Sequence, residues 1–426
     1  MRNYTDLLKN EYGLSEEAVS AFKDAEKSLS DAFKNLDDIA RYNQLKVLNA
    51  FQKNKISYAH FGETSGYGYD DMGRDTLDRV FADAFGAEDA LVRHNIVSGT
   101  QAIASCLYGI LRPGDKMLSV VGAPYDTMEE VIGIRGGEDT GSLKDFGISY
   151  GQIDLLPDGE VDHNKIMSTL KNEKIKLVLI QRSRGYDWRD SLTVDKIGEI
   201  IKTVKSVSPE TVCMVDNCYG EFAETKEPTE VGADIIVGSL IKNPGGSIAL
   251  SGGYIAGKAE YIEKISYRLT APGIGREVGA SLGFNRNLYQ GFFMSPHIVA
   301  QSIKVSMICA KLFKDLGYDV CPEPEDKRSD IIQAVRFNDK DKLIKFCQSI
   351  QYGSAIDSFV TPEPWDMPGY DNPVIMAAGA FVQGASIELS ADAPICEPYI
   401  AYLQGGVIYD SAVIGVLKAF DAIKDM

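Results

Sequence analysis

Between residues 75 and 260, short apolar runs alternate with longer segments whose apolar residues recur at helical spacing. Residues 177–181 and 212–215 are apolar runs of strand length, and residues 194–207 between them have the spacing of a helix. Parallel strands need a long crossover connection, which such a helix provides. Repetition of this unit predicts an α/β fold with a large, mostly parallel sheet and helices on both faces.

The chain on either side of this region has a different pattern. Residues 14–56 carry apolar side chains near helical spacing, which predicts an N-terminal helical arm. Beyond about residue 300, strand candidates at 331–337 and 385–390 stand among helix candidates, which predicts a smaller α+β domain. We therefore predict an arm over residues 1–60, a large domain over 61–300 and a small C-terminal domain over 301–426.

Composition and charge narrow the classes of partner. The chain has 426 residues, 44% of them hydrophobic, and a net charge of −17. This charge argues against nucleic acid, because phosphate binding needs a basic surface. We expect no membrane span, because no apolar stretch reaches the roughly 20 residues required, and no apolar signal core opens the chain. Seven cysteines without a C-x-x-C pair and four scattered histidines predict a cytoplasmic protein with reduced thiols and no zinc site.

Polar side chains follow four predicted strands at the points where the strands end. They are Tyr125 after residues 116–121, Arg182 and Arg184 after 177–181, Asp216 and Asn217 after 212–215, and Ser239 and Lys242 after 235–237. In open α/β sheets, ligands bind outside the carboxyl ends of the strands. We therefore predict one site that combines an aromatic ring, cations, a carboxylate and an amine.

The order of these features along the chain indicates a cofactor. Residues 98–100 (Ser-Gly-Thr) precede a helix candidate, and the N–H groups of a helix start bind phosphate, although an ordinary N-cap has the same sequence. Asp216 suits a protonated pyridine nitrogen, and Lys242 suits a Schiff base because its neighbours are apolar and glycine-rich. Pyridoxal 5′-phosphate (PLP) requires these groups. Ser239 would add a hydroxyl to the phosphate, and Tyr125 a ring stacked on the cofactor.

Two further patterns in the sequence bear on ligand binding. Arg182 and Arg184 are candidates for binding a substrate carboxylate, because a guanidinium group binds carboxylates through two hydrogen bonds. The sequence does not choose between them and Arg268, Arg276, Arg328 and Arg336. Residues 273–279 echo a dinucleotide loop, but they follow Ala-Pro rather than a strand, and the third glycine is one place late.

Six segments carry a resemblance to a known family: residues 66–71, 96–100, 181–186, 215–217, 242–246 and 386–390. In these segments the chain resembles the PLP-dependent enzymes of Cys/Met metabolism, which have the aminotransferase fold of type I. It is most similar to the group named as the methionine γ-lyase family or aluminium-resistance proteins. The likeness covers nearly the whole chain.

The resemblance implies roles for the residues at the strand ends. Lys242 would be the lysine that bonds to PLP, Asp216 the partner of the pyridine nitrogen, and Tyr125 the stacking ring. The amides of Ser98, Gly99 and Thr100, together with the Ser239 hydroxyl, would hold the phosphate, and Asn217 would brace Asp216.

The resemblance also implies an assembly and a reaction. The assembly is a homotetramer built from dimers with shared active sites, in which Tyr69, with Arg74, reaches the phosphate of the neighbouring subunit. The reaction is β- or γ-elimination from a sulfur amino acid, which releases a thiol, ammonia and a 2-oxo acid. Lys242 would remove the α-proton, and Tyr125 would protonate the leaving sulfur.

Three positions depart from the family pattern. Gln101 stands where a histidine is expected, Ile241 where better-known lyases carry a hydroxyl, and Cys396 where close relatives carry an arginine. That arginine would help to bind the substrate carboxylate, so the departure at Cys396 bears on the choice of substrate. Two alternatives therefore stay open: a γ-replacement enzyme of the cystathionine synthase or sulfhydrylase type, and a PLP-binding regulatory protein with weak catalysis.

Overall fold

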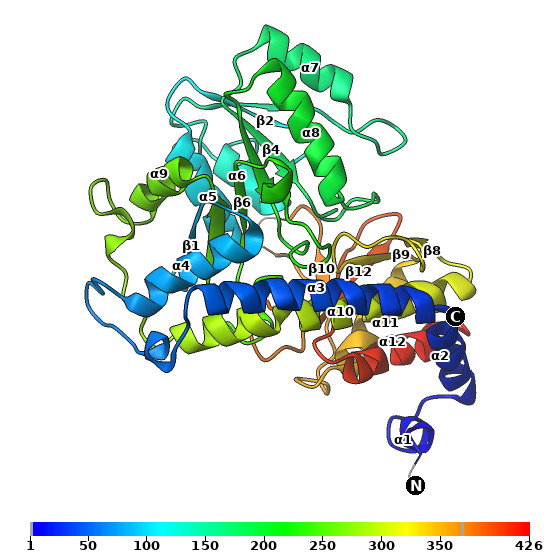
Figure 1. Cartoon of the computed structure of the whole chain (residues 1–426). Coiled ribbons are helices and arrows are strands. Elements are labelled where there is room, and N and C mark those ends of the chain that lie inside the picture. Colours follow the sequence, from blue (N-terminus) through cyan, green and yellow to red (C-terminus); the bar gives the residue numbers. More distant parts are fainter. Residues whose placement is uncertain (1–2, 368–369) are drawn as a thin grey trace. The chain divides into compact units, whose positions relative to one another are not determined.

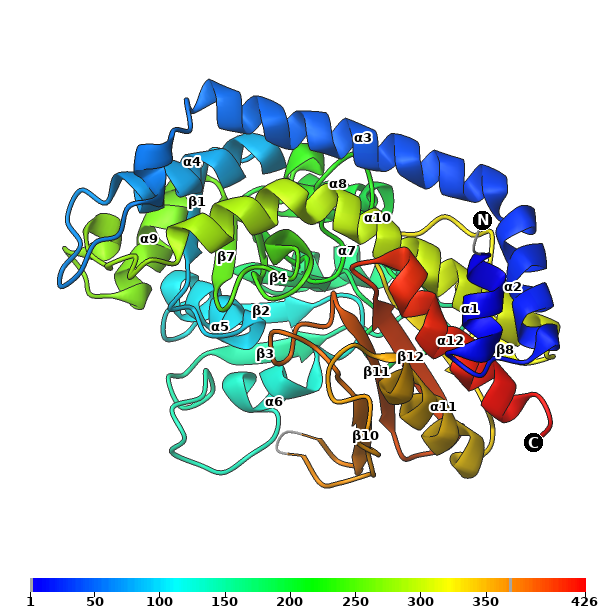
Figure 2. The same ribbon diagram turned by 90° about the horizontal axis from the view of Figure 1, so that it is seen from below.

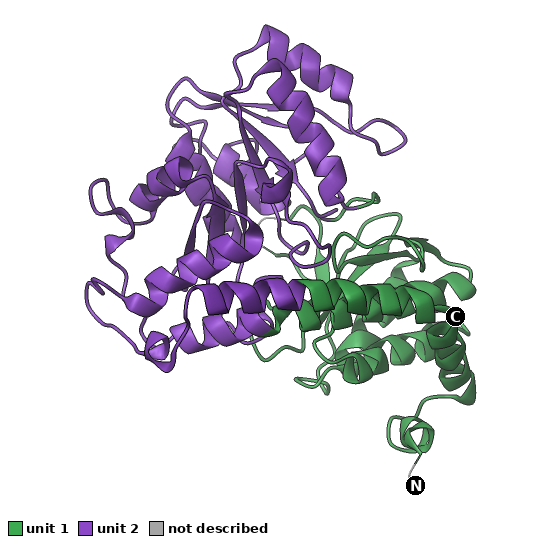
Figure 3. Ribbon diagram, viewed as in Figure 1, with its two compact units in different colours: residues 1–42, 186–190, 294–426 green, residues 43–185, 191–293 purple. Residues whose placement is uncertain are grey.

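The structure is a computed structural model that describes residues 3–367 and 370–426. Its internal contacts divide the chain into two units, which Figure 3 colours separately. Unit 1 comprises residues 1–42, 186–190 and 294–426, and unit 2 comprises residues 43–185 and 191–293. The division falls inside the long helices α3 (Ser30–Lys53) and α10 (Asn285–Asp315), and the boundary predicted near residue 300 also lies within α10.

The described residues of unit 2 contain a seven-stranded sheet with the order β1-β7-β6-β5-β4-β2-β3. The strands are β1 (Asp89–Arg93), β2 (Lys116–Ser119), β3 (Ser149–Gln152), β4 (Leu177–Gln181), β5 (Val212–Asp216), β6 (Ile235–Ser239) and β7 (Gly253–Gly257). β7 runs antiparallel to both of its neighbours, and the other strands are parallel to one another. The mostly parallel sheet predicted from the alternating pattern is thus confirmed.

Helices cover both faces of this sheet (Figure 1). The helical elements of unit 2 after α3 are η1 (Tyr58–Phe61), α4 (Met72–Phe85), α5 (Gly99–Ile110), α6 (Asp126–Ile132), α7 (His163–Asn172), α8 (Val194–Val207), η2 (Pro228–Val231), η3 (Asn243–Gly245), α9 (Ala259–Leu269) and η4 (Gly275–Glu277). Apolar side chains of α5, α6 and α9 form one buried cluster with those of the strands. Figure 2 shows α4 and α8 on the opposite side of the sheet.

Helix α8 illustrates why the elements form where the sequence predicts them. Its buried residues are Val194, Ile197, Ile200, Ile201 and Val204. This spacing of three and four residues places all of them on one face of a helix. The Thr193 side chain accepts the Lys196 N–H at 3.2 Å and so caps the helix start. The flanking strands β4 and β5 are buried at every position, as strands covered on both faces are.

Unit 1 is smaller and has an antiparallel sheet, as predicted for an α+β domain. In its described residues the strand order is β10-β11-β12-β9-β8. The remaining elements of the chain are α1 (Tyr4–Asn10), α2 (Glu16–Ser28), β8 (Asp319–Cys321), β9 (Gln333–Arg336), α11 (Lys340–Gly353), β10 (Val374–Ala377), β11 (Leu389–Pro394), β12 (Ile400–Gly405) and α12 (Tyr409–Ile423). Across the described residues, no helix has the length and apolarity to cross a membrane.

The strand predicted at residues 385–390 is displaced in the structure, because β11 begins only at Leu389. The preceding residue, Glu388, turns its carboxylate toward the backbone. This carboxylate accepts the N–H groups of Phe381 at 2.7 Å and Val382 at 3.0 Å. A side chain bonded in this way holds residues 381–388 in a compact turn, and apolar periodicity alone did not reveal it.

Candidate functional site

A cavity of about 190 Å³ in unit 2 lies at the carboxyl ends of β5 and β6 and at the start of α5. The predicted site residues that line it are Ser98, Gly99, Thr100, Tyr125, Asp216, Ser239 and Lys242. Segments that are far apart in the sequence therefore meet in one cavity. This is the position at which open α/β sheets bind their ligands.

The first turn of α5 forms one wall of the cavity. The Ser98 Oγ accepts the Gln101 N–H at 3.0 Å, so Ser98 is the N-cap of this helix. The amides of Gly99 and Thr100 have no acceptor within the helix, as at any helix start, and they carry the positive end of its dipole. A Cβ atom on Gly99 would lie 3.6 Å from the Ser239 Cβ, which shows how closely the helix approaches the end of β6.

Ser239, the last residue of β6, presents a buried hydroxyl beside this helix start. Its side chain is only 2% exposed, and within the described residues its Oγ has no hydrogen-bond partner. A buried hydroxyl without a partner is uncommon in folded proteins and points to a group that the protein itself does not supply. Together with the amides of Gly99 and Thr100, this hydroxyl forms a cradle suited to phosphate oxygens.

Asp216 and Lys242 bring a carboxylate and an amine to the same cavity. Asp216 ends β5, and its Oδ1 accepts the Cys218 N–H at 3.1 Å. Burial raises the pKa of Asp216, whereas the nearby Lys242 acts to lower it. Burial acts to lower the pKa of the Lys242 amine, but Cys218, Tyr219 and Asp216 beside it raise that pKa above its ordinary value. The amine is therefore held as a cation in this environment.

Tyr219 lines the cavity and was not predicted from the sequence. The Lys242 Nζ lies over its ring, 3.9 Å from the ring centroid. The backbone of Tyr219 has φ of 73°, in the left-handed region that is uncommon for residues other than glycine. The one feature of the sequence that pointed to Tyr219 was its position three residues after Asp216. Sequence alone does not reveal that its backbone is left-handed or that its ring lies against a lysine.

Asn217 and the two predicted arginines take part in a buried polar network. Asn217 Oδ1 accepts a hydrogen bond from Arg182 at 2.7 Å, and its Nδ2 donates to Glu227 at 3.0 Å. The Arg182 guanidinium group is fully buried and pairs with Glu224 at 3.2 Å. Arg184 is also fully buried. None of Asn217, Arg182 and Arg184 is among the described residues that line the cavity, so binding of a substrate or cofactor by them stays a prediction.

Tyr69 and Arg74 lie in another part of unit 2. Tyr69 is 62% exposed, and its ring lies 5.7 Å from that of Tyr67. Arg74 is buried and donates hydrogen bonds to the carbonyl oxygens of Gly68 and Gly279, both at 2.8 Å. The described lining of the cavity does not include Tyr69 or Arg74. Their predicted contact with a neighbouring subunit's phosphate stays a prediction.

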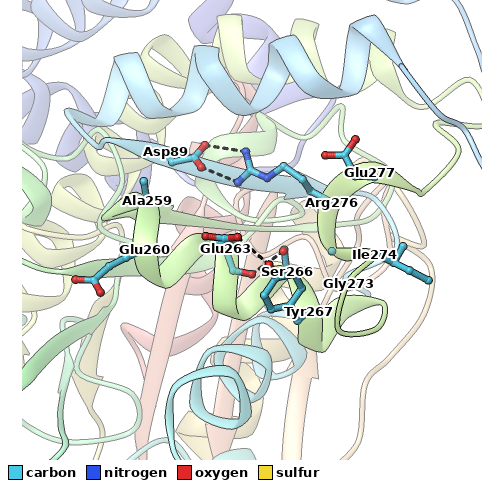
Figure 4. A pocket seen from close by; sticks show the side chains of 11 residues that line it. Asp89, Ala259, Glu260, Glu263, Ser266, Tyr267, Gly273, Ile274, Arg276 and Glu277 are labelled. Carbon is cyan, nitrogen blue, oxygen red and sulfur yellow. Dashed lines mark hydrogen bonds and ion pairs between the residues drawn. The ribbon is translucent and has the colours of Figure 1, made fainter.

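A larger cavity of about 500 Å³ lies beside α9 and residues 273–277 (Figure 4). Arg276 in its wall forms a two-point ion pair with Asp89, with N–O distances of 3.0 and 2.8 Å. The glycine run at 273–279 follows helix α9, so it does not have the strand–turn–helix arrangement of a dinucleotide loop. The residues predicted to bind a cofactor are absent from the described lining of this second cavity.

Comparison with known proteins identifies the family. Residues 18–424 match the family model of methionine gamma-lyase. The chain belongs to the methionine gamma-lyase family. Members of this family are PLP-dependent enzymes. The chain is 50% identical to the uncharacterized protein YnbB of Bacillus subtilis (strain 168), over 94% of this chain and 95% of the relative.

Two crystal structures from Clostridium are close to this methionine gamma-lyase family member. One, from Clostridium acetobutylicum, is described as a candidate cystathionine beta-lyase involved in aluminum resistance; it is 51% identical, covers 99% of both chains and has a TM-score of 0.96. The other, from Clostridium novyi NT, is described as a carbon-sulfur lyase involved in aluminum resistance. It is 54% identical over 98% of this chain and 99% of that chain, with a TM-score of 0.94.

A more distant likeness shows the fold alone. The PLP-dependent protein YhfS from Escherichia coli is 17% identical and has a TM-score of 0.61, over 90% of this chain and 96% of that chain. The predicted fold of type I is thus confirmed.

The cavity residues fit PLP. The unpartnered Ser239 hydroxyl and the amides of Gly99 and Thr100 suit its phosphate, while Asp216 and Lys242 suit its pyridine nitrogen and its aldehyde carbon. Through the described ranges, no group of three or more His, Cys, Asp or Glu side chains is arranged to hold a metal ion.

Proposed function

We propose that this protein is a PLP-dependent carbon–sulfur lyase that cleaves a sulfur amino acid by β- or γ-elimination. One observation carries the proposal: Lys242, Asp216 and the unpartnered Ser239 hydroxyl line a single cavity at the start of α5. Membership of the methionine gamma-lyase family and the carbon-sulfur lyase name of the Clostridium novyi relative support it. The localisation that we propose is cytoplasmic.

The residues of the cavity would each hold one part of the cofactor. The amides of Gly99 and Thr100 and the hydroxyl of Ser239 would bind the phosphate, and the Asp216 carboxylate would keep the pyridine nitrogen protonated. Tyr125 would lie against the ring. When bound, PLP supplies an electron sink for the pair of electrons that remains when the substrate loses its α-proton.

Lys242 would act as the base that removes the α-proton from the substrate. The negative charge of Asp216 contributes to the raised pKa of the Lys242 amine and so favours its protonated form. The influence of this charge must be removed before the amine can lose its own proton and act as a base. Pairing of Asp216 with the pyridine nitrogen would remove this influence, since the carboxylate charge is then neutralised by another cation. The same aspartate would thus serve both the cofactor and the base.

Tyr125 would donate its phenolic proton to the sulfur atom as the carbon–sulfur bond breaks. This tyrosine shares the cavity with Lys242, so an acid and a base would be available to one bound substrate. The products would be a thiol, ammonia and a 2-oxo acid, with one water molecule consumed. The substrate we propose is a small amino acid with sulfur at its β or γ carbon.

We also propose that the protein works as a homotetramer built from dimers with shared active sites. Tyr69 would reach the phosphate site of the neighbouring subunit, with Arg74 holding the loop that carries it. The exposure of Tyr69, at 62%, supports a role outside its own subunit. The hydrogen bonds from Arg74 to the Gly68 and Gly279 carbonyl oxygens would fix the base of the loop that carries Tyr69.

The first test is the visible absorbance of the purified protein with PLP, before and after borohydride, followed by peptide mapping. We expect a reduced adduct on Lys242. Lys242→Ala should remove the adduct and lower turnover by at least about 100-fold, the effect of losing a general base. Lys264→Ala, a change at an exposed lysine, is the matched control and should leave both unchanged. Full activity in Lys242→Ala would contradict the proposed role.

A second test separates the proposed lyase from its alternatives. Cysteine, cystathionine, methionine and homocysteine are supplied in turn, and thiol and 2-oxo acid are measured with and without an added thiol. A lyase releases 2-oxo acid without an added thiol, whereas a γ-replacement enzyme forms a new thioether only when a thiol is present. Bound PLP with no turnover of any of the four substrates would favour the regulatory alternative.

A further inference from the structure

The contact between Tyr219 and Lys242 has no part in the function proposed above. The Lys242 Nζ lies 3.9 Å from the centroid of the Tyr219 ring, and both residues line the same cavity. An ammonium group over an aromatic face is attracted by the ring, and the attraction is stronger where water is excluded. Lys242 is partly buried where it lines the cavity. The ring therefore gives the amine a defined position.

The loop that carries Lys242 also fixes the loop that carries Tyr219. Asn243, the residue after Lys242, donates hydrogen bonds from Nδ2 to the carbonyl oxygens of Tyr219 at 2.9 Å and Glu221 at 3.1 Å. Tyr219 has φ of 73°, a conformation that costs energy for a tyrosine and persists only when its surroundings impose it. The strain is located where the ring meets the lysine, which is typical of functional sites.

We propose that Tyr219 is a positioning residue for Lys242: its ring holds the lysine amine whenever that amine is not bonded to the cofactor. This would include the stage of each turnover at which Lys242 acts as the base. The inference rests on the PLP-dependent function proposed above. The groups that face the amine are Cys218, Asp216 and Tyr219, the last through both its ring and its hydroxyl, so Tyr219 remains as a partner when Asp216 is engaged by the cofactor.

The test measures the amine in the cofactor-free protein, so it needs neither a substrate nor turnover. Trace labelling with acetic anhydride across a pH series, followed by peptide mass spectrometry, gives the pH midpoint at which Lys242 becomes reactive. In Tyr219→Leu we expect this midpoint to fall by about one pH unit, the size of a partly buried cation–π contact. Tyr219→Phe keeps the ring face and should restore a midpoint close to that of the wild type.

Lys264 is an internal reference in the same samples. It lies 5.2 Å from the centroid of the Tyr261 ring, and its side chain is 47% exposed. The extent of its labelling should be the same in every variant. Circular dichroism establishes that each variant is folded. If Tyr219→Leu is not folded, Tyr219→Asn replaces it, because asparagine tolerates the left-handed conformation.

An unchanged Lys242 midpoint in folded Tyr219→Leu or Tyr219→Asn would overturn the inference. So would a Lys242 midpoint in Tyr219→Phe that falls as far as in Tyr219→Leu. Failure of the lyase function is distinguishable from failure of this inference. Absence of turnover in the wild type would remove the proposed reaction and leave the labelling result intact, since labelling reports only on the contact between Tyr219 and Lys242.

Discussion

Glu221 is a carboxyl group whose protonation is decided mainly by its burial. One of its oxygens accepts a hydrogen bond from the Tyr254 hydroxyl at 2.8 Å, and within the described chain the other has no partner. The adjacent Glu224 and Glu227 share the charge of Arg182, at 3.2 and 3.7 Å. Burial raises the pKa of Glu221 to about 8, so we infer that the group is protonated at neutral pH.

This raised pKa predicts how stability depends on pH. The ordinary pKa of the group is 4.5, so from about pH 5 to 8 the folded protein keeps a proton that the unfolded chain has lost. The free energy of unfolding therefore falls as pH rises through this window. Glu221→Gln has no proton to lose, so the fall should be smaller by roughly 1–3 kcal/mol.

The measurement is urea unfolding of wild type and Glu221→Gln at several pH values between about 5 and 8. Glu199→Gln is the matched control, because Glu199 is exposed on α8, and its pH dependence should follow that of the wild type. A wild-type pH dependence in folded Glu221→Gln would show that Glu221 is ionised in the native protein.

At the scale of elements, α10 packs against η3, the turn that follows Lys242. A Cβ atom on Gly291 of α10 would lie 2.1 Å from the Gly245 carbonyl oxygen, so this approach requires glycine. Asn287, one turn earlier, donates a hydrogen bond to the Ile248 carbonyl oxygen at 3.3 Å. The start of α10 thus braces the segment that carries the proposed catalytic lysine.

Gly291→Ala should therefore disturb both stability and the site. Overpacking costs about 1–3 kcal/mol, offset in part by the roughly 1 kcal/mol that alanine adds to helix propensity. We expect a lower melting temperature and weaker PLP binding, measured by thermal unfolding and by PLP titration. Gln290→Ala, a change at the exposed neighbouring position, should alter neither quantity. Unchanged PLP binding in Gly291→Ala would show that η3 tolerates movement of α10.

At the scale of the whole molecule, exposed aromatic and apolar residues of unit 2 support the self-association that we propose. Tyr58, Tyr67 and Leu282 are 78%, 75% and 57% exposed. The Gly279 N–H donates to the Tyr67 carbonyl oxygen at 2.8 Å, so residues near 67 and near 280 share one surface. Large exposed side chains gathered in this way mark interaction surfaces. We expect light scattering to give a mass above that of one chain.

Complementation between inactive subunits tests whether the sites are shared. Tyr69→Ala and Lys242→Ala are co-expressed with different tags, and the mixed dimer is purified. One of its two sites would contain both Lys242 and the partner's Tyr69, so the purified mixed dimer should recover about half of wild-type turnover. Recovery no greater than the sum of the two separate variants would show that Tyr69 does not complete a neighbouring site.

The sequence by itself determined most elements of the large sheet and the place where its strands end. Strands such as β4 and helices such as α8 follow from local periodicity, because burial on one or both faces fixes which positions are apolar. The gathering of Asp216, Ser239 and Lys242 in one cavity was predictable for a similar reason: parallel strands direct their carboxyl ends to the same edge of a sheet.

The tertiary structure alone decided the features that depend on distant contacts. β7 lies between β1 and β6 and runs antiparallel to both, an order that local periodicity does not encode. The burial of Arg182 among glutamates depends on how the loop after β5 folds back. Tyr219 has a left-handed backbone and lies with its ring against Lys242, and its carbonyl oxygen accepts a hydrogen bond from the Asn243 side chain. Such contacts join residues that only the folded chain brings together, so their energies are absent from any local pattern.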